Sequence, residues 1–569
     1  MGMNRRTFLS KTAVAAIPAQ EDQPSLKRKA IDNPFANKTL PNVARTTTGL
    51  EPYTGPWGYD QVAHLLRRTM FGAKKSDVAN MMSKTLDEVI ALLLTDLPAP
   101  DPPLNTSSTD PDVAVGVTWV NAATNSSNSS RNNSLKSWWI GLMLNQPVSL
   151  REKMALFWHN HFVSEATEVK DARFAYKQNA LLRQFAFGNF KELAKQITID
   201  PAMLRYLNGN TNTGTNPNEN YARELQELFT IGKGPEIAPG NYTNYTENDV
   251  KAAAQVLTGW RDQGSTLSSY FTASRHDSSN KQFSADYGNA VIVGRTGMDG
   301  ANEIDDLLNL IFAQQETAKF ICRKLYRWFV YYVIDSAAET NVIVPLANIL
   351  RNNNYETKPV LQALFKSAHF FDAVNIGCII KNPIDHSVGM LRQFSVPFPD
   401  SSNITTQYTM WKYVRTQAAN MQMDLCDPPN VAGWSAYYQL PQYYELWINS
   451  DTLPKRNQLT DIIINAGYQQ SGFKLIADPI AFINQVSNPY DPNIIVSEFS
   501  QILFPIAITD NQKAFLKETL IPGLPDYEWT TEWSDYVHDP TNQAKLTAVK
   551  SKLQALLGFM MDMAEYQLI

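Results

Sequence analysis

Apolar residues recur at three- and four-residue intervals along most of this chain, which is the period of an α-helix. The pattern predicts helices at about 59–69, 76–82, 86–94, 134–145, 149–163, 168–187, 190–198, 218–231, 246–259, 303–314, 316–333, 340–352, 357–366, 381–395, 408–421 and 543–565, and the helix at 246–259 begins at a capping pattern of Thr246 and Asp249. Strand signals are confined to residues 264–297, in Ser269–Thr272 and Ala290–Val293. We therefore expect an all-α protein, a large multi-helix, bundle-like body with a small β-hairpin excursion near 264–297.

Breaks in this pattern divide the chain into parts. Residues 1–20 are interpreted as a signal, and residues 21–54, rich in Pro, Lys, Asn and Thr, as a linker. A helical domain is expected at 55–465, with a C-terminal helical segment, 466–569, packed on it. Within the domain, residues 97–133 contain a proline-rich stretch and an Asn/Ser run, and are predicted to form a mobile surface loop.

The N-terminus favours export. Residues Asn4–Lys11 resemble a twin-arginine motif around Arg5 and Arg6, and a mildly apolar stretch, Thr12–Ile17, follows. The other interpretation is an N-terminal tail that happens to contain two arginines. No run of eighteen apolar residues occurs, so we expect a periplasmic or otherwise exported protein with no transmembrane segment.

Composition excludes several kinds of partner and chemistry. The net charge is −5, and no cluster of lysines and arginines stands out, so no nucleic-acid partner is expected. The three cysteines are far apart, without the spacing of a zinc knuckle or redox motif. Neither a phosphate-binding loop, a dinucleotide fingerprint, His-Glu-x-x-His nor Gly-x-Ser-x-Gly occurs, which argues against nucleotide hydrolases, dehydrogenases, common zinc proteases and α/β-hydrolases.

The segment 218–228 carries carboxylates, amides and an arginine at the start of an amphipathic helix. At 100° per residue, Glu224 lies at the border of the apolar face, whereas Gln226 lies on the face expected to be wet. A buried, unpaired carboxylate is costly or shifts its pKa, so Glu224 is expected to have a partner. It is either a structural carboxylate, paired for instance with Arg67 or Arg68, or part of a functional site.

A second informative stretch contains two histidines. Ser149 to Glu152 has the pattern of a capping box, so a helix is expected to begin there. His159 and His161 then lie about 200° apart around that helix and cannot both face one metal ion. A histidine on an apolar face is either a hydrogen-bonded core residue or a ligand.

These stretches and others resemble signature blocks of the bacterial domain of unknown function 1800 family. In chain order the blocks are His64–Gly72, Phe157–Phe162, Asn218–Leu225, Leu257–Trp260, His276-Asp277, Phe320–Leu325, Asp427–Trp434, Trp447 and Arg456, and the resemblance covers roughly residues 55–465. The resemblance implies a mostly helical exported protein and supplies no reaction. Members often occur beside a sulfatase-like family, which implies a sulfatase-like partner.

The candidate site follows from these blocks. Candidate catalytic residues are Glu219, Arg223, Glu224, His276 and Asp277, and candidate metal ligands are His64, His159 and His161. Imidazole and carboxylate groups bind a divalent metal such as Zn, Fe or Mn, and they also act as acid–base pairs. No ligand pair shares one helix face, so the same residues could equally form a buried network that holds helices in register.

Two classes of function remain open at this point. The first is a metal-dependent hydrolase or oxidoreductase that uses the His/Glu/Asp set. The second is a non-catalytic cell-envelope assembly or binding protein that works with the sulfatase-like partner.

Overall fold

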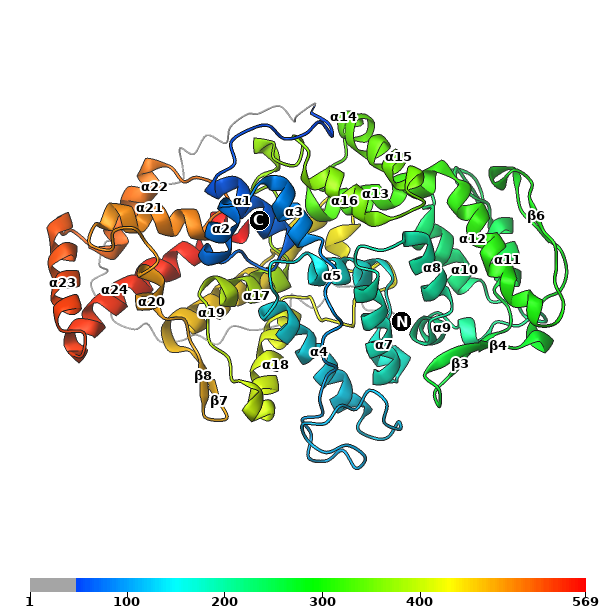
Figure 1. The fold of residues 1–569 in the computed structure, drawn as a ribbon, viewed down its shortest axis with the longest axis horizontal. Coiled ribbons are helices and arrows are strands. Elements are labelled where there is room, and N and C mark those ends of the chain that lie inside the picture. The colour runs from blue at the N-terminus through cyan, green and yellow to red at the C-terminus, as the bar shows by residue number, and fades with distance from the viewer. Residues whose placement is uncertain (1–47) are drawn as a thin grey trace, which may run out of the picture. The chain divides into compact units, whose positions relative to one another are not determined.

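Helices make up most of the chain that the computed structural model describes, residues 48–569 (Figure 1). The predicted signal, residues 1–20, and most of the linker lie outside the described residues. The first half contains α1 (Tyr59–Thr69), α2 (Lys75–Met82), α3 (Leu86–Leu93), α4 (Asn128–Leu144), α5 (Arg151–His161), α6 (Ala166–Val169), α7 (Ala172–Gln184), α8 (Phe190–Thr198), α9 (Pro201–Tyr206), α10 (Glu219–Glu224) and α11 (Glu247–Val256).

Helices resume after the β-rich excursion. They are α12 (Glu303–Ala313), α13 (Gln315–Phe329), α14 (Ser336–Ala338), α15 (Val344–Asn352), α16 (Thr357–Phe365), α17 (Pro383–Gln393), α18 (Ile404–Asn420), α19 (Thr452–Asp461), α20 (Pro479–Ile483), α21 (Pro492–Leu503), α22 (Asp510–Leu520), α23 (Asp526–His538) and α24 (Gln543–Asp562). π-Helical turns follow α10 at Leu225–Thr230, α14 at Glu339–Ile343 and α19 at Ile462–Ala466. The expectation of an all-α body is confirmed.

Strands in the described residues form four two-stranded antiparallel hairpins. They pair β1 (Glu236–Ala238) with β2 (Asn241–Tyr242), β3 (Trp260–Gln263) with β4 (Ser268–Phe271), β5 (Lys281–Gln282) with β6 (Val291–Ile292), and β7 (Tyr468–Gln470) with β8 (Phe473–Leu475). The predicted excursion at 264–297 contains β4, β5 and β6. Its two expected strands do not pair with each other, because β4 pairs with β3 and β6 pairs with β5.

Helix starts follow the capping signals where the side chains are free to act locally. The Thr246 N–H donates to the Asp249 carboxylate at 2.7 Å, and α11 begins at Glu247. Helix α5 begins at Arg151, as the Ser149 signal predicts, but the Glu152 side chain does not cap it. Glu152 accepts hydrogen bonds from Arg183 and Trp139 instead, because both partners reach it in the core.

Residues 97–133, expected to form a mobile loop, make several tertiary contacts. The buried Arg131 guanidinium pairs with Asp110 at 2.7 Å, and Trp119 is fully buried. Helix α4 already begins at Asn128, six residues before its predicted start, because the Asn/Ser run supplies its first turn.

Helices α1 and α17 approach each other backbone to backbone. Gly72 follows α1 in the left-handed region, at φ 73°, and a Cβ there would lie 2.6 Å from the Cα of Gly389 on α17. Because only glycine has no side chain to separate the two backbones, this contact brings the C-terminal end of α1 close to α17. Arg68 and Asp385 are thereby placed near each other.

The last residues return to the same region. The N–H of Lys381 donates to the carbonyl of Gln567, and the N–H of Ile569 donates to the carbonyl of Ile379, both at 2.8 Å. The segment 379–382, which leads into α17, is therefore held between the helical body and the end of the chain.

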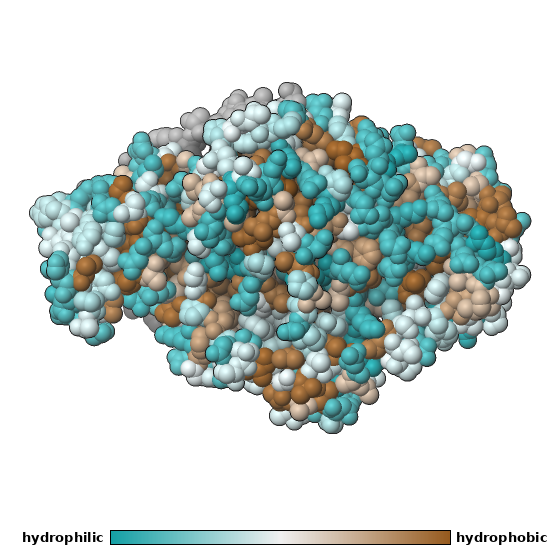
Figure 2. Space-filling model, viewed as in Figure 1, coloured by the Kyte–Doolittle hydropathy of each residue, from teal (hydrophilic) through white to brown (hydrophobic). Residues whose placement is uncertain are grey.

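The viewed face of the molecule carries small apolar groups dispersed among polar side chains (Figure 2). Single exposed apolar residues are normal for a protein surface. Among residues 48–569, no helix is both long and apolar enough to cross a bilayer.

Candidate functional site

The helix predicted at 218–231 is divided between α10 and a π-helical turn, Leu225–Thr230. Gln226 is fully buried in this turn and accepts a hydrogen bond from the Tyr287 hydroxyl at 2.9 Å. The prediction that Gln226 faces solvent is wrong. The β-rich excursion that carries Tyr287 covers this face, and a π-helical turn does not follow the 100° step used for the prediction.

Glu219 and Arg223 belong to an ion-pair group on the surface. Arg223 lies 3.2 Å from Glu219 and 2.7 Å from Glu247, measured between nitrogen and oxygen atoms. All three side chains are about one-third exposed. Such exposed pairs contribute little to stability, typically about 0–1 kcal/mol.

The Glu224 side chain is half-buried and makes no hydrogen bond or ion pair with any residue in the described part of the chain. The suggested partners are elsewhere: Arg67 donates to the carbonyls of Gln501 and Ile502, and Arg68 donates to the carbonyl of Asn375. Burial, reinforced by the charge of nearby Glu227, raises the pKa of Glu224 to about 7. The raised pKa favours the neutral carboxyl group, which can be half-buried without the expected cationic partner.

His276 belongs to a buried network. Its Nδ1 lies 3.1 Å from the Thr258 carbonyl oxygen, and its Nε2 lies 3.1 Å from Glu303 Oε1. Glu303 also pairs with Lys281 at 2.6 Å, and both of those side chains are fully buried. Burial alone would raise the pKa of Glu303, but hydrogen bonds from His276 and Lys281 lower it.

Asp277 joins this network only through its backbone: its N–H donates to the Thr258 hydroxyl at 2.9 Å, and its carbonyl accepts from the Lys281 ammonium. Its carboxylate accepts from the N–H and hydroxyl of Ser279, at 2.8 and 2.5 Å, in a local turn. The network joins the β-rich excursion to α12 through Glu303, which suits a role in holding that excursion in place.

The three candidate metal ligands are buried and lie in separate environments. His64 Nε2 donates to the carbonyl of Phe370 at 3.1 Å, and His161 Nε2 donates to that of Phe229 at 2.9 Å. His159 lies between the rings of Trp139 and Trp434, and burial lowers its pKa to about 4. In the described part of the chain, no three His, Cys, Asp or Glu residues are grouped so as to hold a metal ion.

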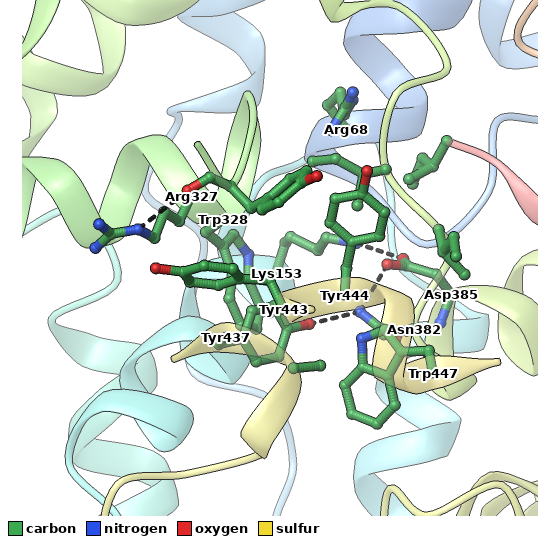
Figure 3. A pocket seen from close by; sticks show the side chains of 15 residues that line it. Arg68, Lys153, Arg327, Trp328, Asn382, Asp385, Tyr437, Tyr443, Tyr444 and Trp447 are labelled. Atoms are coloured by element: carbon green, nitrogen blue, oxygen red, sulfur yellow. Dashed lines mark hydrogen bonds and ion pairs between the residues drawn. The ribbon is translucent and has the colours of Figure 1, made fainter. Parts of the chain in front are cut away.

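A cleft lined by a different set of residues lies between α1, α5, α13, α17 and the segment that follows Trp434 (Figure 3). Its lining consists of Arg68, Lys153, Arg327, Trp328, Tyr332, Ile379, Ile380, Asn382, Asp385, Ala436, Tyr437, Tyr443, Tyr444, Trp447 and Ile569. The cavity volume is about 30 Å³, which holds water-sized molecules. Several of these residues belong to, or directly follow, the family-like blocks.

The polar side of the cleft is a hydrogen-bonded group centred on Asp385. One oxygen of Asp385 pairs with Lys153 of α5, and the other accepts from the Asn382 amide at 2.8 Å. The same amide nitrogen lies 3.0 Å from the Tyr437 hydroxyl. Figure 3 shows these contacts between Lys153, Asp385, Asn382 and Tyr437 as dashed lines.

Local sequence positions this group. Asn382 is the N-cap of α17, and its side-chain oxygen accepts from the Asp385 N–H at 2.8 Å. Pro383 occupies the first turn, where its missing N–H is not needed. Asn382 and Asp385 therefore project from one rigid helix start, opposite Lys153 on α5.

The remaining walls are aromatic. The rings of Trp328 and Tyr437 are stacked with centroids 4.2 Å apart, and Tyr332 packs against Tyr443 at 5.3 Å and Tyr444 at 4.6 Å. We call residues 435–447 the aromatic flap: Tyr437, Tyr443, Tyr444 and Trp447 line the cleft, whereas residues 438–442 are exposed. The flap thus covers the polar group with rings.

Burial shifts both members of the central ion pair towards their neutral forms. Desolvation lowers the pKa of the Lys153 amine and raises the pKa of the Asp385 carboxyl, while the attraction between them opposes both shifts. A lysine with a lowered pKa can act as a base, and perturbed titratable groups in a cleft mark candidate functional sites.

Sequence reasoning did not identify Lys153, Asn382 and Asp385 as site residues. The signal for two of them is present, because Asn-Pro-x-Asp is a helix-start pattern that places Asn382 and Asp385 on one helix end. Nothing in the sequence indicates that Lys153 faces them across 232 residues. That pairing depends on how α5 packs against α17.

A family model described as protein of unknown function (DUF1800) matches residues 64–568. The comparisons with curated proteins and with solved structures found no match.

Proposed function

The chain belongs to the DUF1800 family, and from that premise we propose that it is an exported hydrolase whose active site is the aromatic cleft. The observation that supports the proposal is the buried Lys153–Asp385 pair, which lies among aromatic walls and is held by Asn382. A mostly apolar pocket with a few convergent polar groups and perturbed pKa values is the usual form of an active site.

In the proposed reaction, Lys153 is the general base and Asp385 orients it. A water molecule attacks the electrophilic atom of the substrate, and its proton passes to the Lys153 amine. The bond from that atom to the leaving oxygen breaks, and the leaving oxygen takes the proton from the Lys153 ammonium group. Desolvation of Lys153 favours the neutral amine that the first transfer needs.

The aromatic flap provides the binding surface for the rest of the substrate. Tyr444 and Tyr332 are half-buried, and their rings meet at 4.6 Å over the cleft. A cavity of about 30 Å³ is smaller than a ring-sized substrate, so the flap opens to admit it and closes behind it. Closure removes water, which strengthens the polar contacts at Lys153.

Export through the twin-arginine motif at Arg5 and Arg6 is part of the proposal. Two alternatives compete with this proposal. One is a metal-dependent form of the reaction, and the other is a non-catalytic role in cell-envelope assembly with a sulfatase-like partner.

The test is hydrolysis of a panel of 4-nitrophenyl esters, glycosides, phosphates and sulfates by the purified protein. Lys153→Arg retains the charge but cannot release its proton, so we expect kcat to fall at least about 100-fold with KM nearly unchanged. Tyr444→Ala is expected to raise KM. Tyr438→Ala, in the exposed part of the same flap, is the matched control and is expected to behave like the wild type.

Three results would count against the proposal. Wild-type rates in Lys153→Arg would remove Lys153 from the reaction. Loss of activity with EDTA, restored by a divalent metal, would favour the metal-dependent form. No turnover of any substrate, together with recovery of the sulfatase-like protein in stable complex with this chain, would favour the assembly role.

A further inference from the structure

The Lys153–Asp385 pair lies within a wider group of buried cations. Arg68, Lys381 and Arg456 are each at most 7% exposed, as are Lys153 and Asp385. All four cations interact electrostatically with Asp385, which is the carboxylate they share. We call Arg68, Lys153, Lys381 and Arg456 the buried cation group.

Three members of this group, Arg68, Lys381 and Arg456, make no ion pair at contact distance with a carboxylate among residues 48–569. Arg456 donates to the Lys381 carbonyl at 2.7 Å, and Arg68 donates to the Asn375 carbonyl at 2.7 Å. The Lys381 ammonium donates to the Tyr566 carbonyl and lies 3.7 Å from the centre of the Tyr566 ring. Neutral carbonyls and a ring face therefore replace negative charge around them.

Donor atoms of the group also remain without a protein partner in the described part of the chain. These are Nε and Nη1 of Arg68 and Nε of Arg456, all shielded from solvent. A buried guanidinium is strongly destabilising when its donors and its charge are not compensated. Of these residues, Arg68 lines the cleft itself.

Burial lowers the pKa of Lys381 and Arg456, two members of the buried cation group, and for Lys381 neighbouring positive charges add to the shift. Burial, followed by repulsion from Arg67 and Arg456, lowers the pKa of Lys381 well below its usual value. Burial also lowers the pKa of Arg456 to about 10. Asp385 is the single acidic side chain of the cleft lining, which also contains Arg68, Lys153 and Arg327.

We propose that the ligand of the aromatic cleft carries an anionic group, a carboxylate or a phosphate or sulfate ester, which Arg68 binds. The planar fork of arginine suits the paired oxygens of such groups. This inference rests on the proposed function, since it assigns the substrate class of the same cleft. An acidic ligand would supply the charge that the buried cation group lacks.

The test compares neutral and anionic ligands of matched shape on the full chain. Binding of glucose, glucuronate, glucose 6-phosphate and glucose 6-sulfate is measured by calorimetry at constant ionic strength, together with inorganic phosphate and sulfate against chloride. We expect at least one anionic probe to bind at least about 10-fold more tightly than its neutral counterpart. Arg68→Lys is expected to weaken that binding about 10-fold or more.

Arg327→Gln is the second variant, in case Arg68→Lys does not fold, because Arg327 is only partly buried at the cleft. Lys412→Gln on exposed α18 surface is the control and is expected to bind as the wild type does. Equal binding of neutral and anionic probes would overturn the inference and leave the proposed function standing. Binding of inorganic phosphate or sulfate that depends on Arg68, without turnover of any substrate, would support the inference against the proposed hydrolase. Anion binding that neither cleft variant changes, or no binding at all, would overturn the inference.

Discussion

Lys153 on α5 and Asp385 on α17 form an ion pair in which neither side chain is more than 5% exposed, although 232 residues separate them along the chain. The pair joins the two helices at the polar side of the aromatic cleft. Burying either charge alone would cost much more free energy than burying the two as a pair.

Removal of one partner is therefore expected to destabilise the fold strongly. Lys153→Met leaves Asp385 buried without its cation, and we expect the free energy of unfolding to fall by about 3–5 kcal/mol. Urea denaturation measures the change. The double variant Lys153→Met/Asp385→Leu is expected to recover part of the loss, because it removes both charges. Lys455→Met breaks an exposed pair with Asp451 and is the control, with an expected loss below about 1 kcal/mol.

Glu224 is expected to make stability depend on pH. Its pKa in the folded protein is about 7, above the ordinary value of 4.5, so the folded state binds the proton more tightly than the unfolded state. The contribution of Glu224 to the free energy of unfolding is therefore fully present below about pH 4.5 and is lost as the pH rises to about 7. Glu224→Gln should remove this dependence and be more stable than the wild type at pH 8, by about 1 kcal/mol after allowance for partial exposure.

The measurement is the free energy of unfolding of both proteins between pH 4 and 8. Parallel curves for the wild type and Glu224→Gln would show that Glu224 is solvated at its ordinary pKa. A loss of stability in the variant at pH 8 would show that Glu224 has a cationic partner.

Gln226 gives a test of the π-helical turn. Gln226→Leu leaves the buried Tyr287 hydroxyl without its acceptor, so we expect a loss of about 1–3 kcal/mol in the free energy of unfolding. Adding Tyr287→Phe should restore much of it, since no polar group is then stranded. Gln196→Leu on α8, whose amide bonds Glu192 near the surface, is the control, with an effect within about 0.5 kcal/mol. An equal response of the two single variants would place Gln226 in solvent.

Export is tested at the N-terminus. Changing Arg5 and Arg6 together to lysine is expected to keep the protein in the cytoplasm if the twin-arginine pathway recognises them. Cell fractionation measures the distribution, and a periplasmic protein with an unrelated signal serves as the control. Unchanged delivery of the variant would show that the two arginines are incidental to export.

Local sequence by itself determined the helical class of this protein and many of its helix ends. A helix start is stabilised by contacts between residues three or four apart, such as Thr246 and Asp249. Because these contacts are local, the sequence pattern predicts them. The start of α17 at Asn382-Pro383 is equally local. The spacing of apolar residues likewise depends only on the helical repeat.

Tertiary structure decided which polar groups meet. Glu152 occupies a capping-box position in the sequence, but its carboxylate pairs with Arg183. Gln226 occupies a helix position expected to face solvent, but it is buried and accepts a hydrogen bond from Tyr287. The cleft takes Lys153 from α5, Asp385 from α17 and its aromatic rings from α13 and the flap. Such pairings depend on how helices far apart in the chain pack together, so a local sequence pattern cannot predict them. Burial in the packed structure then shifts the pKa of each group, which the local sequence cannot predict either.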